Sequence, residues 1–350
     1  MMSTLRIGNT NIGTGHPTFV VAEMSGNHGG QLERALQIVR AAAKAGANAI
    51  KLQTYTADTI TLDSNAPDFQ LQSGPWQSHR RLWDLYNVAH TPWEWHTPIF
   101  EEARQLGLEV FSSPFDESAV DLLESLGSVA YKIASPEINH IPLLRYVAST
   151  GKPVILSSGL ARLTDIELAL ETLRVGGARD IVLLKCTSAY PAPTNETNLL
   201  TIPDMAQRFG VVSGLSDHSI GTAVAVAAVA VGAKVIEKHF TLEGDEETVD
   251  SFFSLDQQQF KQMVEDIRTA ELALGRISYD IAPSAQQSLS GMRSLYISAP
   301  VRAGDPFTTK NIRCVRPSFG LHPRYFDQIL TRKARRDLPM GARLRLEDIE

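Results

Sequence analysis

The chain has 350 residues and is 43% hydrophobic and 21% charged, which is ordinary for a water-soluble globular protein. This length exceeds what one hydrophobic core usually organises, so we expect one large domain and a smaller one. The net charge of −6 argues against nucleic acid as a general partner.

The distribution of charge, the cysteines and the apolar runs indicate which partners and which cellular compartment the protein has. Residues 290–350 contain 12 Lys and Arg against 6 Asp and Glu, a net charge of +6, which leaves −12 for the rest. Such a basic appendage can bind nucleic acid, dock on an acidic neighbour or hold an anionic substrate, and the scattering of its basic residues among Gly and Pro disfavours nucleic acid. Cys186 and Cys314 form no metal-binding pair and fit a reducing compartment. No run spans a bilayer and no secretory pattern begins the chain, so we expect a cytoplasmic protein without a membrane partner.

Short apolar or β-branched runs alternate with longer segments of helical period. The predicted strands are residues 18–24, 48–55, 109–115, 130–135, 153–159, 180–188, 211–218 and 234–240. Asp116 and Thr164 are predicted to cap the helices that follow the third and fifth strands. Eight strands alternating with helices predict an α/β fold, a (β/α)8 TIM barrel over residues 1–281. A doubly wound open sheet is the rival, but no GxGxxG turn follows the first strand.

Three segments break this rhythm. Residues 56–91, which include Trp76, form either a lid or binding loop or a packed excursion with its own helix. Residues 282–289 are polar, contain Pro283 and predict a linker. Residues 290–350 alternate short strands with Gly-Asp turns, which predicts a small β-rich domain.

The C-terminal ends of the predicted strands are strongly polar, and barrels place their chemistry at that end. The polar residues there are Glu23, Lys51, Gln53, Ser113, Lys132, Ser135, Glu137, Ser157, Lys185, Ser188, Ser216, Asp217, His218, Glu237, Lys238 and His239. Buried ionisable groups are costly unless they pair or meet a ligand. Lys51, Lys132 and Lys185, with serines between them, predict a cradle for phosphate or carboxylate.

His218 and His239 end the seventh and eighth predicted strands, which are neighbours in a barrel. Two imidazoles from adjacent strand ends can share a divalent cation, and carboxylates or water beside them favour Mn²⁺ or Mg²⁺. We expect Asp217, Glu237 and Lys238 to lie beside this pair. A purely structural role stays open for each histidine.

The chain resembles the sialic acid synthase family, whose members condense phosphoenolpyruvate with an N-acetylated amino sugar. The resemblance runs from about residue 18 to the end and rests on residues 22–28, 51–54, 112–115, 131–135, 214–218 and 237–240. Residues 290–350 resemble the antifreeze-like (SAF) domain that ends these synthases. Residues 22–28 (AEMSGNH) and 51–63 (KLQTYTADTITLD) resemble the pseudaminic acid synthases of the family more than the N-acetylneuraminate synthases.

The resemblance implies roles for individual residues. It implies that His218 and His239 hold Mn²⁺ or Mg²⁺ and are catalytic together with Glu23 and Glu137, the latter as the acid–base carboxylate. The residues implied to hold phosphoenolpyruvate are Lys51, Ser113, Lys132, Ser135, Ser157, Ser188 and Ser216, and those implied to hold the sugar are Glu23, Gln53, Tyr190 and Asp250. Ser188 departs from the family, which often has Asn there. A domain-swapped homodimer is also implied, in which Arg316 of one subunit contacts the N-acetyl group in the other's barrel.

The resemblance implies synthesis of pseudaminic acid from phosphoenolpyruvate, water and 2,4-diacetamido-2,4,6-trideoxy-altrose, with C–O cleavage and release of phosphate. N-acetylneuraminate and legionaminic acid synthases are the alternatives within the family. More distant alternatives are a metal-dependent barrel hydrolase or isomerase and a non-catalytic carbohydrate-binding protein. The hydrolase or isomerase would show more histidine or carboxylate ligands and fewer lysines at the strand ends.

Overall fold

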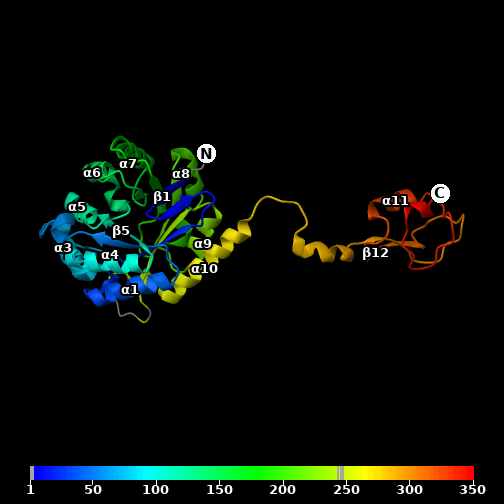
Figure 1. Ribbon diagram of the computed structural model, residues 1–350, viewed down its shortest axis with the longest axis horizontal. Helices are drawn as coiled ribbons and strands as arrows, with labels where there is room; N and C mark the ends of the chain where they lie inside the picture. The colour runs from blue at the N-terminus through cyan, green and yellow to red at the C-terminus, as the bar shows by residue number, and fades with distance from the viewer. Residues whose placement is uncertain (1–3, 243, 245–247) are drawn as a thin grey trace. The chain divides into compact units, whose positions relative to one another are not determined.

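The structure, a computed structural model, describes residues 4–242, 244 and 248–350. The chain divides into two compact units, one that ends at Gly275 and one that begins at Arg276 (Figure 1). The sequence pattern places the end of the barrel at residue 281 and a linker at 282–289, a stretch that the 3-10 helix η8 (Pro283–Gly291) overlaps. Within the described part of the chain, no helix is both long enough and apolar enough to cross a membrane.

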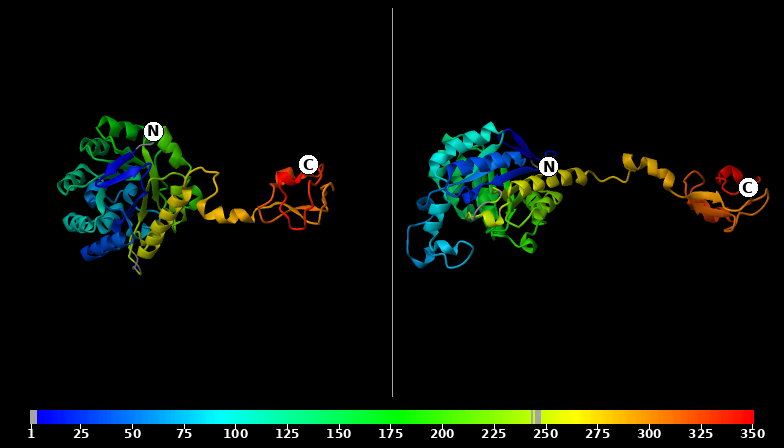
Figure 2. Two further views of the ribbon diagram at one scale, coloured as in Figure 1. Left: turned by 45° about the vertical axis from the view of Figure 1, so that its right-hand side comes forward. Right: turned by 90° about the horizontal axis from the view of Figure 1, so that it is seen from below.

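The first unit is a closed barrel of parallel strands, which confirms the predicted fold class (Figures 1 and 2). Its strands follow one another in chain order, and the last one closes the barrel against the first. They are β3 (Phe19–Glu23), β4 (Ala49–Thr54), β5 (Glu109–Pro114), β6 (Tyr131–Ile133), β7 (Val154–Ser157), β8 (Ile181–Cys186), β9 (Val212–Asp217) and β10 (Val235–His239). Each of them lies within a run that the sequence predicts to be a strand.

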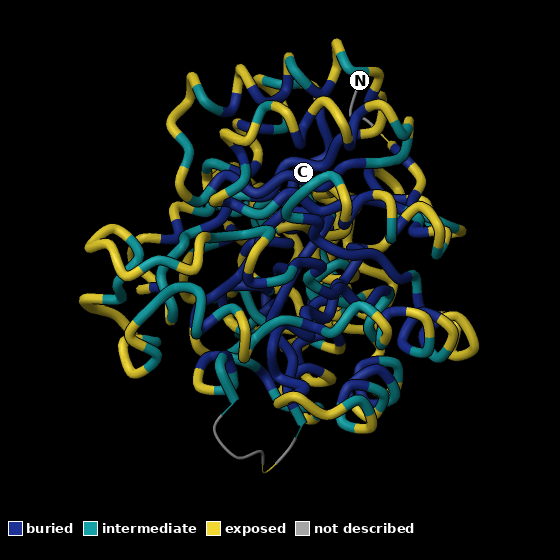
Figure 3. The backbone as a smooth tube through the Cα atoms, turned by 90° about the vertical axis from the view of Figure 1, so that its left-hand side faces the viewer, coloured by how far each residue is buried: buried dark blue, intermediate teal, exposed yellow. Residues whose placement is uncertain are grey.

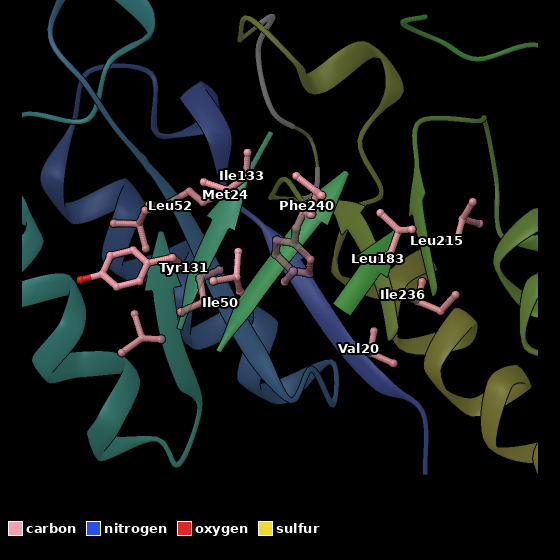
Figure 4. Close-up of a cluster of buried hydrophobic side chains, with 14 of the residues drawn as sticks. Val20, Met24, Ile50, Leu52, Tyr131, Ile133, Leu183, Leu215, Ile236 and Phe240 are labelled. Atoms are coloured by element: carbon pink, nitrogen blue, oxygen red, sulfur yellow. The ribbon is translucent and has the colours of Figure 1, made fainter. Parts of the chain in front are cut away.

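Alternation along these strands sorts the side chains into layers, because successive residues point to opposite faces. Val20, Ile50 and Leu183 point outward and pack in the core between the barrel and its helices (Figure 4). Phe19 and Phe111 point inward and fill the N-terminal end of the barrel. Polar residues follow two positions after the inward-pointing Val21, Ala49, Ala130 and Val235, so the alternation that builds the core also directs Glu23, Lys51, Lys132 and Glu237 into the C-terminal mouth.

The helices surround the barrel, and the strands in the middle are buried while the outer helical turns are exposed (Figure 3). They are α1 (Leu32–Lys44), α4 (His96–Gln105), α5 (Glu117–Ser125), α6 (Ile141–Ser149), α7 (Leu163–Val175), α8 (Thr201–Phe209), α9 (Ala223–Ala230) and α10 (Gln257–Leu274). Asp116 caps α5 through its carboxylate, as the sequence predicts. The prediction that Thr164 caps α7 is wrong, because α7 already begins at Leu163 and the carboxylate of Asp165 accepts from the Arg162 N–H at 2.8 Å.

A hairpin of β1 (Thr4–Ile7) and β2 (Thr10–Gly13), which the sequence pattern did not reveal, precedes the barrel. Its buried residues Leu5, Ile7 and Ile12 join the inward-facing barrel core. The hairpin therefore covers the N-terminal end of the barrel, and the chemistry is left to the opposite mouth.

The 56–91 segment is a packed excursion that also reaches the mouth. It contains α2 (Ala57–Ile60) and α3 (Leu82–Ala89), and the Trp83 indole donates to Asp58 at 2.9 Å. The Trp76 indole N–H donates to the Val249 carbonyl at 2.8 Å, in the connection after β10. In Figure 2 (right) this light-blue segment lies at the opposite end of the barrel from the dark-blue hairpin. The segment therefore packs as an excursion with its own helices and also reaches the mouth, as a lid or binding loop would.

The second unit has its own small core around the antiparallel pair β11 (Ser294–Ile297) and β12 (Ile312–Val315), with one short helix, α11 (Phe326–Ile329). Leu295, Phe307 and Leu344 are among its buried residues. Isolated bridges, such as Val301 with Leu338, tie the remaining turns together. This is the small β-rich domain that the sequence predicts.

Candidate active site

Four charged side chains form a buried layer at the mouth of the barrel. The Lys51 ammonium lies 3.1 Å from Glu23 Oε2 and 3.2 Å from Glu237 Oε1. The Lys132 ammonium lies 3.7 Å from the same Glu237 oxygen. Parallel pairing places Glu23 opposite Lys51 across β3 and β4, so strand register brings these charges together. Two of the three lysines predicted to form an anion cradle are therefore here, neutralised by two carboxylates.

The pKa values show how unequally this neutralisation is shared. Burial on its own would raise the pKa of Glu237, but Lys132 and Lys51 outweigh it and lower that pKa to about 2. Burial would likewise lower the pKa of Lys51, but the carboxylates of Glu23 and Glu237 keep it above its ordinary value. At two other groups burial outweighs the neighbouring charges: it lowers the pKa of Lys132 and raises the pKa of Glu23. Lys132 is thus the cation that gains most from an incoming anion.

Serine hydroxyls surround the charged layer as the sequence predicts. Ser113 Oγ lies 3.4 Å from Lys51 Nζ, and the Ser216 hydroxyl donates to Glu237 at 3.0 Å. Ser157 Oγ is buried and has no hydrogen-bond partner among the described residues. A buried hydroxyl without a partner costs free energy, so this one fits a ligand oxygen.

Gly159 keeps a space open between three further polar groups. A Cβ atom on Gly159 would lie 2.2 Å from Ser188 Oγ, 2.9 Å from Ser135 Oγ and 3.0 Å from Cys186 Sγ. The Gly159 N–H donates to Ser135 Oγ at 2.9 Å. Ser188, which stands where the family often has Asn, therefore faces the same space as Ser135.

The two histidine rings meet above this layer, with centroids 5.3 Å apart. The Nδ1–H of His218 donates to the Thr187 carbonyl at 3.1 Å, which leaves the lone pair of Nε2 available. Burial, with help from the nearby cations, lowers the pKa of His239 well below its ordinary value, so this ring is neutral. His239 Nδ1 is buried without a hydrogen-bond partner among the described residues and lies 3.8 Å from Asp250 Oδ2.

This pair fits a divalent cation that takes its remaining ligands from water or substrate. Neutral imidazoles are the form that binds metal, and an orphaned ring nitrogen is a ready ligand. Residues 4–242, 244 and 248–350 contain no cluster of three or more His, Cys, Asp or Glu side chains suited to a metal ion.

Cys186 lies beside the histidine pair, with its sulfur 3.8 Å from His218 Nδ1. Burial on its own would raise the pKa of this thiol, but His218 outweighs it and lowers the pKa to about 7. Burial would also lower the pKa of His218, yet the Cys186 sulfur holds it above its ordinary value. A cation at Nε2 competes with that proton, so metal binding here releases protons.

Three predicted neighbours of the site lie elsewhere. Lys238 and Asp217 form a buried ion pair with each other, 2.8 Å between Nζ and Oδ2, on the face of their strands opposite to the inward-pointing residues, although the charge of Lys238 still contributes to the lowered pKa of His239. Lys185 does not join Lys51 and Lys132, since it follows the inward-pointing Leu184, and its ammonium donates to the Cys186 carbonyl at 2.8 Å. The reason is the two-residue period of a strand, which sends neighbours of inward residues to the outer face.

The candidate sugar-binding residues line the same mouth. Gln53 Nε2 donates to Glu23 Oε1 at 2.8 Å, and the Tyr190 ring lies 4.4 Å from the His218 ring. Asp250 accepts a hydrogen bond from the Ser25 hydroxyl, and burial raises the pKa of Asp250 to about 6.

Glu137 belongs to the 3-10 helix η5 (Ser135–Asn139) directly after β6. Its Oε2 atom is buried without a hydrogen-bond partner among the described residues. Burial raises the pKa of Glu137 to about 7, since Lys132 and Lys51 only partly offset the lost solvation. This carboxyl group can therefore give or take a proton near neutral pH.

Arg316 lies in the second unit, exposed and directly after β12. Its contact with a partner's barrel stays a prediction, as does the swapped homodimer. Sequence reasoning placed Glu237 beside the histidine pair but did not predict its ion pairs with the two lysines, and it assigned no role to Gly159 or to Phe253, whose ring lies 4.6 Å from that of His239. The strand period could have identified Glu237 as inward-pointing, because it lies two residues before His239.

A barrel mouth with buried lysines and hydroxyls beneath two histidines defines an enzyme site for a small anionic substrate. The chain belongs to the NeuB family, which residues 38–279 match, and residues 292–350 match the SAF domain. It is thus an enzyme of the nonulosonic acid synthases that condense phosphoenolpyruvate, as the sequence resemblance implies. Enzymes of this family typically use a divalent metal ion.

Similar proteins support this assignment over the whole chain. The chain is 44% identical to a pseudaminic acid synthase of Campylobacter jejuni, with 98% of this chain and 99% of that protein covered. It is 43% identical to a pseudaminic acid synthase of Helicobacter pylori, with 95% and 98% covered. The crystal structure of the Bacillus subtilis spore coat polysaccharide biosynthesis protein SpsE matches with a TM-score of 0.68 and 34% identity, covering 99% of each chain.

Proposed function

We propose that this protein is a pseudaminic acid synthase, which joins phosphoenolpyruvate to 2,4-diacetamido-2,4,6-trideoxy-altrose and releases phosphate. The observation that carries the proposal is the buried layer of Lys51 and Lys132, with serine hydroxyls, directly beneath the rings of His218 and His239. Similarity to the two pseudaminic acid synthases, at 44% and 43% identity, supports this acceptor over those of the other family members.

The anion-binding layer suits both charged groups of phosphoenolpyruvate. Lys51 and Lys132 supply positive charge, while hydroxyls donate hydrogen bonds to phosphate and carboxylate oxygens. The hydroxyls with this role are those of Ser113, Ser135, Ser157, Ser188 and Ser216. Fixed cations also stabilise the charge that develops on the departing phosphate, because they are already oriented when the bond breaks.

The sugar binds in open-chain form, with its aldehyde toward His218 and His239 and its hydroxyls near Glu23, Gln53, Tyr190 and Asp250. His218 and His239 would hold Mn²⁺ or Mg²⁺, which would supply Lewis acidity toward the aldehyde. Arg316 from a second subunit contacts the N-acetyl group in a swapped homodimer, which fits the +6 charge of residues 290–350 against −12 elsewhere.

The reaction balances with one acid–base group near the reacting carbons. Carbon 3 of phosphoenolpyruvate bonds to the aldehyde carbon, whose oxygen gains a proton, and carbon 2 becomes cationic. Water adds to carbon 2 and loses a proton, and the hydroxyl group so formed becomes the keto group as the bond from carbon 2 to the phosphate oxygen breaks, its proton leaving with the phosphate. In this proposal Glu137 exchanges these protons, which its pKa, raised to about 7 by burial, supports.

A phosphate-release assay tests this proposal. With phosphoenolpyruvate, Mn²⁺ and the diacetamido sugar together, we expect phosphate and a nonulosonic acid in equal amounts. N-acetylmannosamine and the legionaminic acid precursor serve as competing acceptors and should turn over more slowly. Phosphate released without any sugar, or none with any diacetamido sugar, would refute the proposal.

A further inference from the structure

A cavity of about 600 Å³ lies at the edge of the barrel mouth, and the reaction described above leaves it without a role. It is bounded by the turn after β3, by the 56–91 segment and by the connection after β10. Trp76 and Phe252 form part of its wall, and Gly29 and Gly30 another part. All of these residues belong to the first unit, so the cavity exists in the barrel by itself.

A chain of aromatic rings connects this cavity to the histidine pair. Tyr190 lies 4.4 Å from His218, and Trp76 lies 5.3 Å from Tyr190. On the other side, Phe252 lies 4.9 Å from Phe253, which contacts His239. Two ring-to-ring steps therefore separate the proposed position of the aldehyde from the cavity, a span that an open-chain hexose can bridge.

Much of the lining of the cavity is apolar. Trp76, Phe252, Val249 and Val88 supply apolar surface, and small residues supply backbone groups and hydroxyls. The described lining residues include His79 but no Asp, Glu, Lys or Arg, and the Arg34 side chain lies next to the lining residue Gly29. A methyl or acetamido group would replace water against this apolar surface at little cost.

The contacts of Trp76 hold the aromatic wall of the cavity rigid enough to discriminate between apolar and polar ligand groups. Its indole N–H is held by the Val249 carbonyl at 2.8 Å, and its ring packs against Tyr190 and Phe252. Phe252 itself is 47% exposed, so its ring presents a large open face for a ligand. A fixed aromatic wall favours an apolar group because burying a hydroxyl against it leaves that hydroxyl unpaired.

We infer that this cavity binds the far end of the acceptor sugar and that Trp76 and Phe252 select a methyl group over a hydroxymethyl group there. The inference rests on the proposed function and refines it, since it names the part of the chain that makes the enzyme prefer a neutral 6-deoxy sugar. Carbon 6 is at the opposite end of the open-chain sugar from the aldehyde. With the aldehyde at the histidine pair, carbon 6 lies at the cavity end of the series of aromatic rings.

The test compares two acceptors that differ only at carbon 6: the 6-deoxy diacetamido sugar and its 6-hydroxy counterpart. A hydrophobic pocket discriminates such neighbours by roughly 10-fold to 200-fold, so wild type should prefer the 6-deoxy sugar within that range. Phe252→Ala should raise KM for the 6-deoxy sugar about tenfold and leave KM for the 6-hydroxy sugar nearly unchanged. KM for phosphoenolpyruvate should stay the same, because the anion layer is untouched.

Two further variants keep this test informative. Trp76→Phe retains an aromatic wall without the indole hydrogen bond and should show a smaller loss of discrimination in the same direction. Tyr146→Ala, which removes a 38% exposed aromatic ring from α6 in the outer helical layer, is the matched control and should behave like wild type. Titration calorimetry of the acceptor measures affinity directly, so a slow variant still gives an answer.

The outcomes separate this inference from the proposed function. If wild type releases phosphate with a diacetamido sugar but Phe252→Ala keeps the full preference for 6-deoxy, the cavity does not select the acceptor. If Phe252→Ala instead weakens association between subunits in sedimentation velocity and leaves the preference intact, the cavity docks a second copy and the inference is wrong. If no diacetamido sugar binds or turns over with wild type, the proposed function itself fails.

Discussion

Replacing Glu237 by Gln removes the carboxylate that two buried ammonium groups share. Its Oε1 atom lies 3.2 Å from Lys51, 3.7 Å from Lys132 and 3.0 Å from the Ser216 hydroxyl. The pKa of Glu237 is lowered from an ordinary 4.5 to about 2, which corresponds to about 3 kcal/mol of stability at pH 7. Breaking a buried ion pair by removing one partner costs about 3–5 kcal/mol, so the two arguments agree.

The pH dependence has a definite sign. A carboxyl group whose pKa is lowered in the folded state stabilises the fold above its unfolded pKa, and this stabilisation is lost as the pH falls toward the folded pKa. The gap between wild type and Glu237→Gln should therefore be full at pH 7 and roughly half as large at pH 3.

Urea unfolding followed by tryptophan fluorescence measures this gap in the barrel alone. The four tryptophans, at positions 76, 83, 93 and 95, all belong to the first unit, so the signal does not report on the second. Glu265→Gln, on the exposed face of α10 where its carboxylate lies 3.7 Å from Lys261, is the matched control and should change little. A gap below about 1 kcal/mol at pH 7, or one that does not narrow in acid, would refute the reasoning.

Further predictions concern the space at Gly159, the histidines and Glu137. Gly159→Ala places a methyl group 2.2 Å from Ser188 Oγ and should raise KM for phosphoenolpyruvate at least about tenfold. The control is Gly291→Ala, whose methyl group meets no atom within 4 Å and which should leave this KM unchanged. Equal KM values for the two variants would contradict the anion site. His239→Ala should lose Mn²⁺ binding in titration calorimetry and keep the circular dichroism spectrum of wild type; retained binding would remove His239 from the ligand set. Glu137→Gln should lower kcat about 10²-fold or more. It should also abolish the titration of kcat/KM near pH 7, because burial raises the pKa of Glu137 to about 7. An unchanged pH profile would show that another group transfers the proton.

The barrel and much of its site could be predicted because both follow from the alternation of strands with helices along the chain. Strands that alternate with helices specify the fold, and the polar residues at strand ends mark the mouth. Glu23, Lys51, Lys132 and the two histidines all lie where that pattern places them. The β1–β2 hairpin was not predictable in this way, since two four-residue strands carry too little periodicity.

The errors arise where side-chain direction matters more than position along the chain. Asp217, Lys238 and Lys185 are as close to the strand ends as the catalytic candidates, yet the two-residue period turns them away from the mouth. The roles of Trp76, Phe252 and Gly159 depend on contacts between segments far apart in sequence, which composition and spacing do not encode.

The proposed chemistry is tested most directly by following the bridging oxygen of phosphoenolpyruvate. Phosphoenolpyruvate labelled with ¹⁸O at that atom is incubated with the enzyme, Mn²⁺ and the diacetamido sugar, and the phosphate is analysed by ³¹P NMR. Attack of carbon 3 on the aldehyde with C–O cleavage predicts that the label leaves in the phosphate, and that it does so only when the sugar is present. Unlabelled phosphate, or labelled phosphate without the sugar, would contradict the proposed condensation.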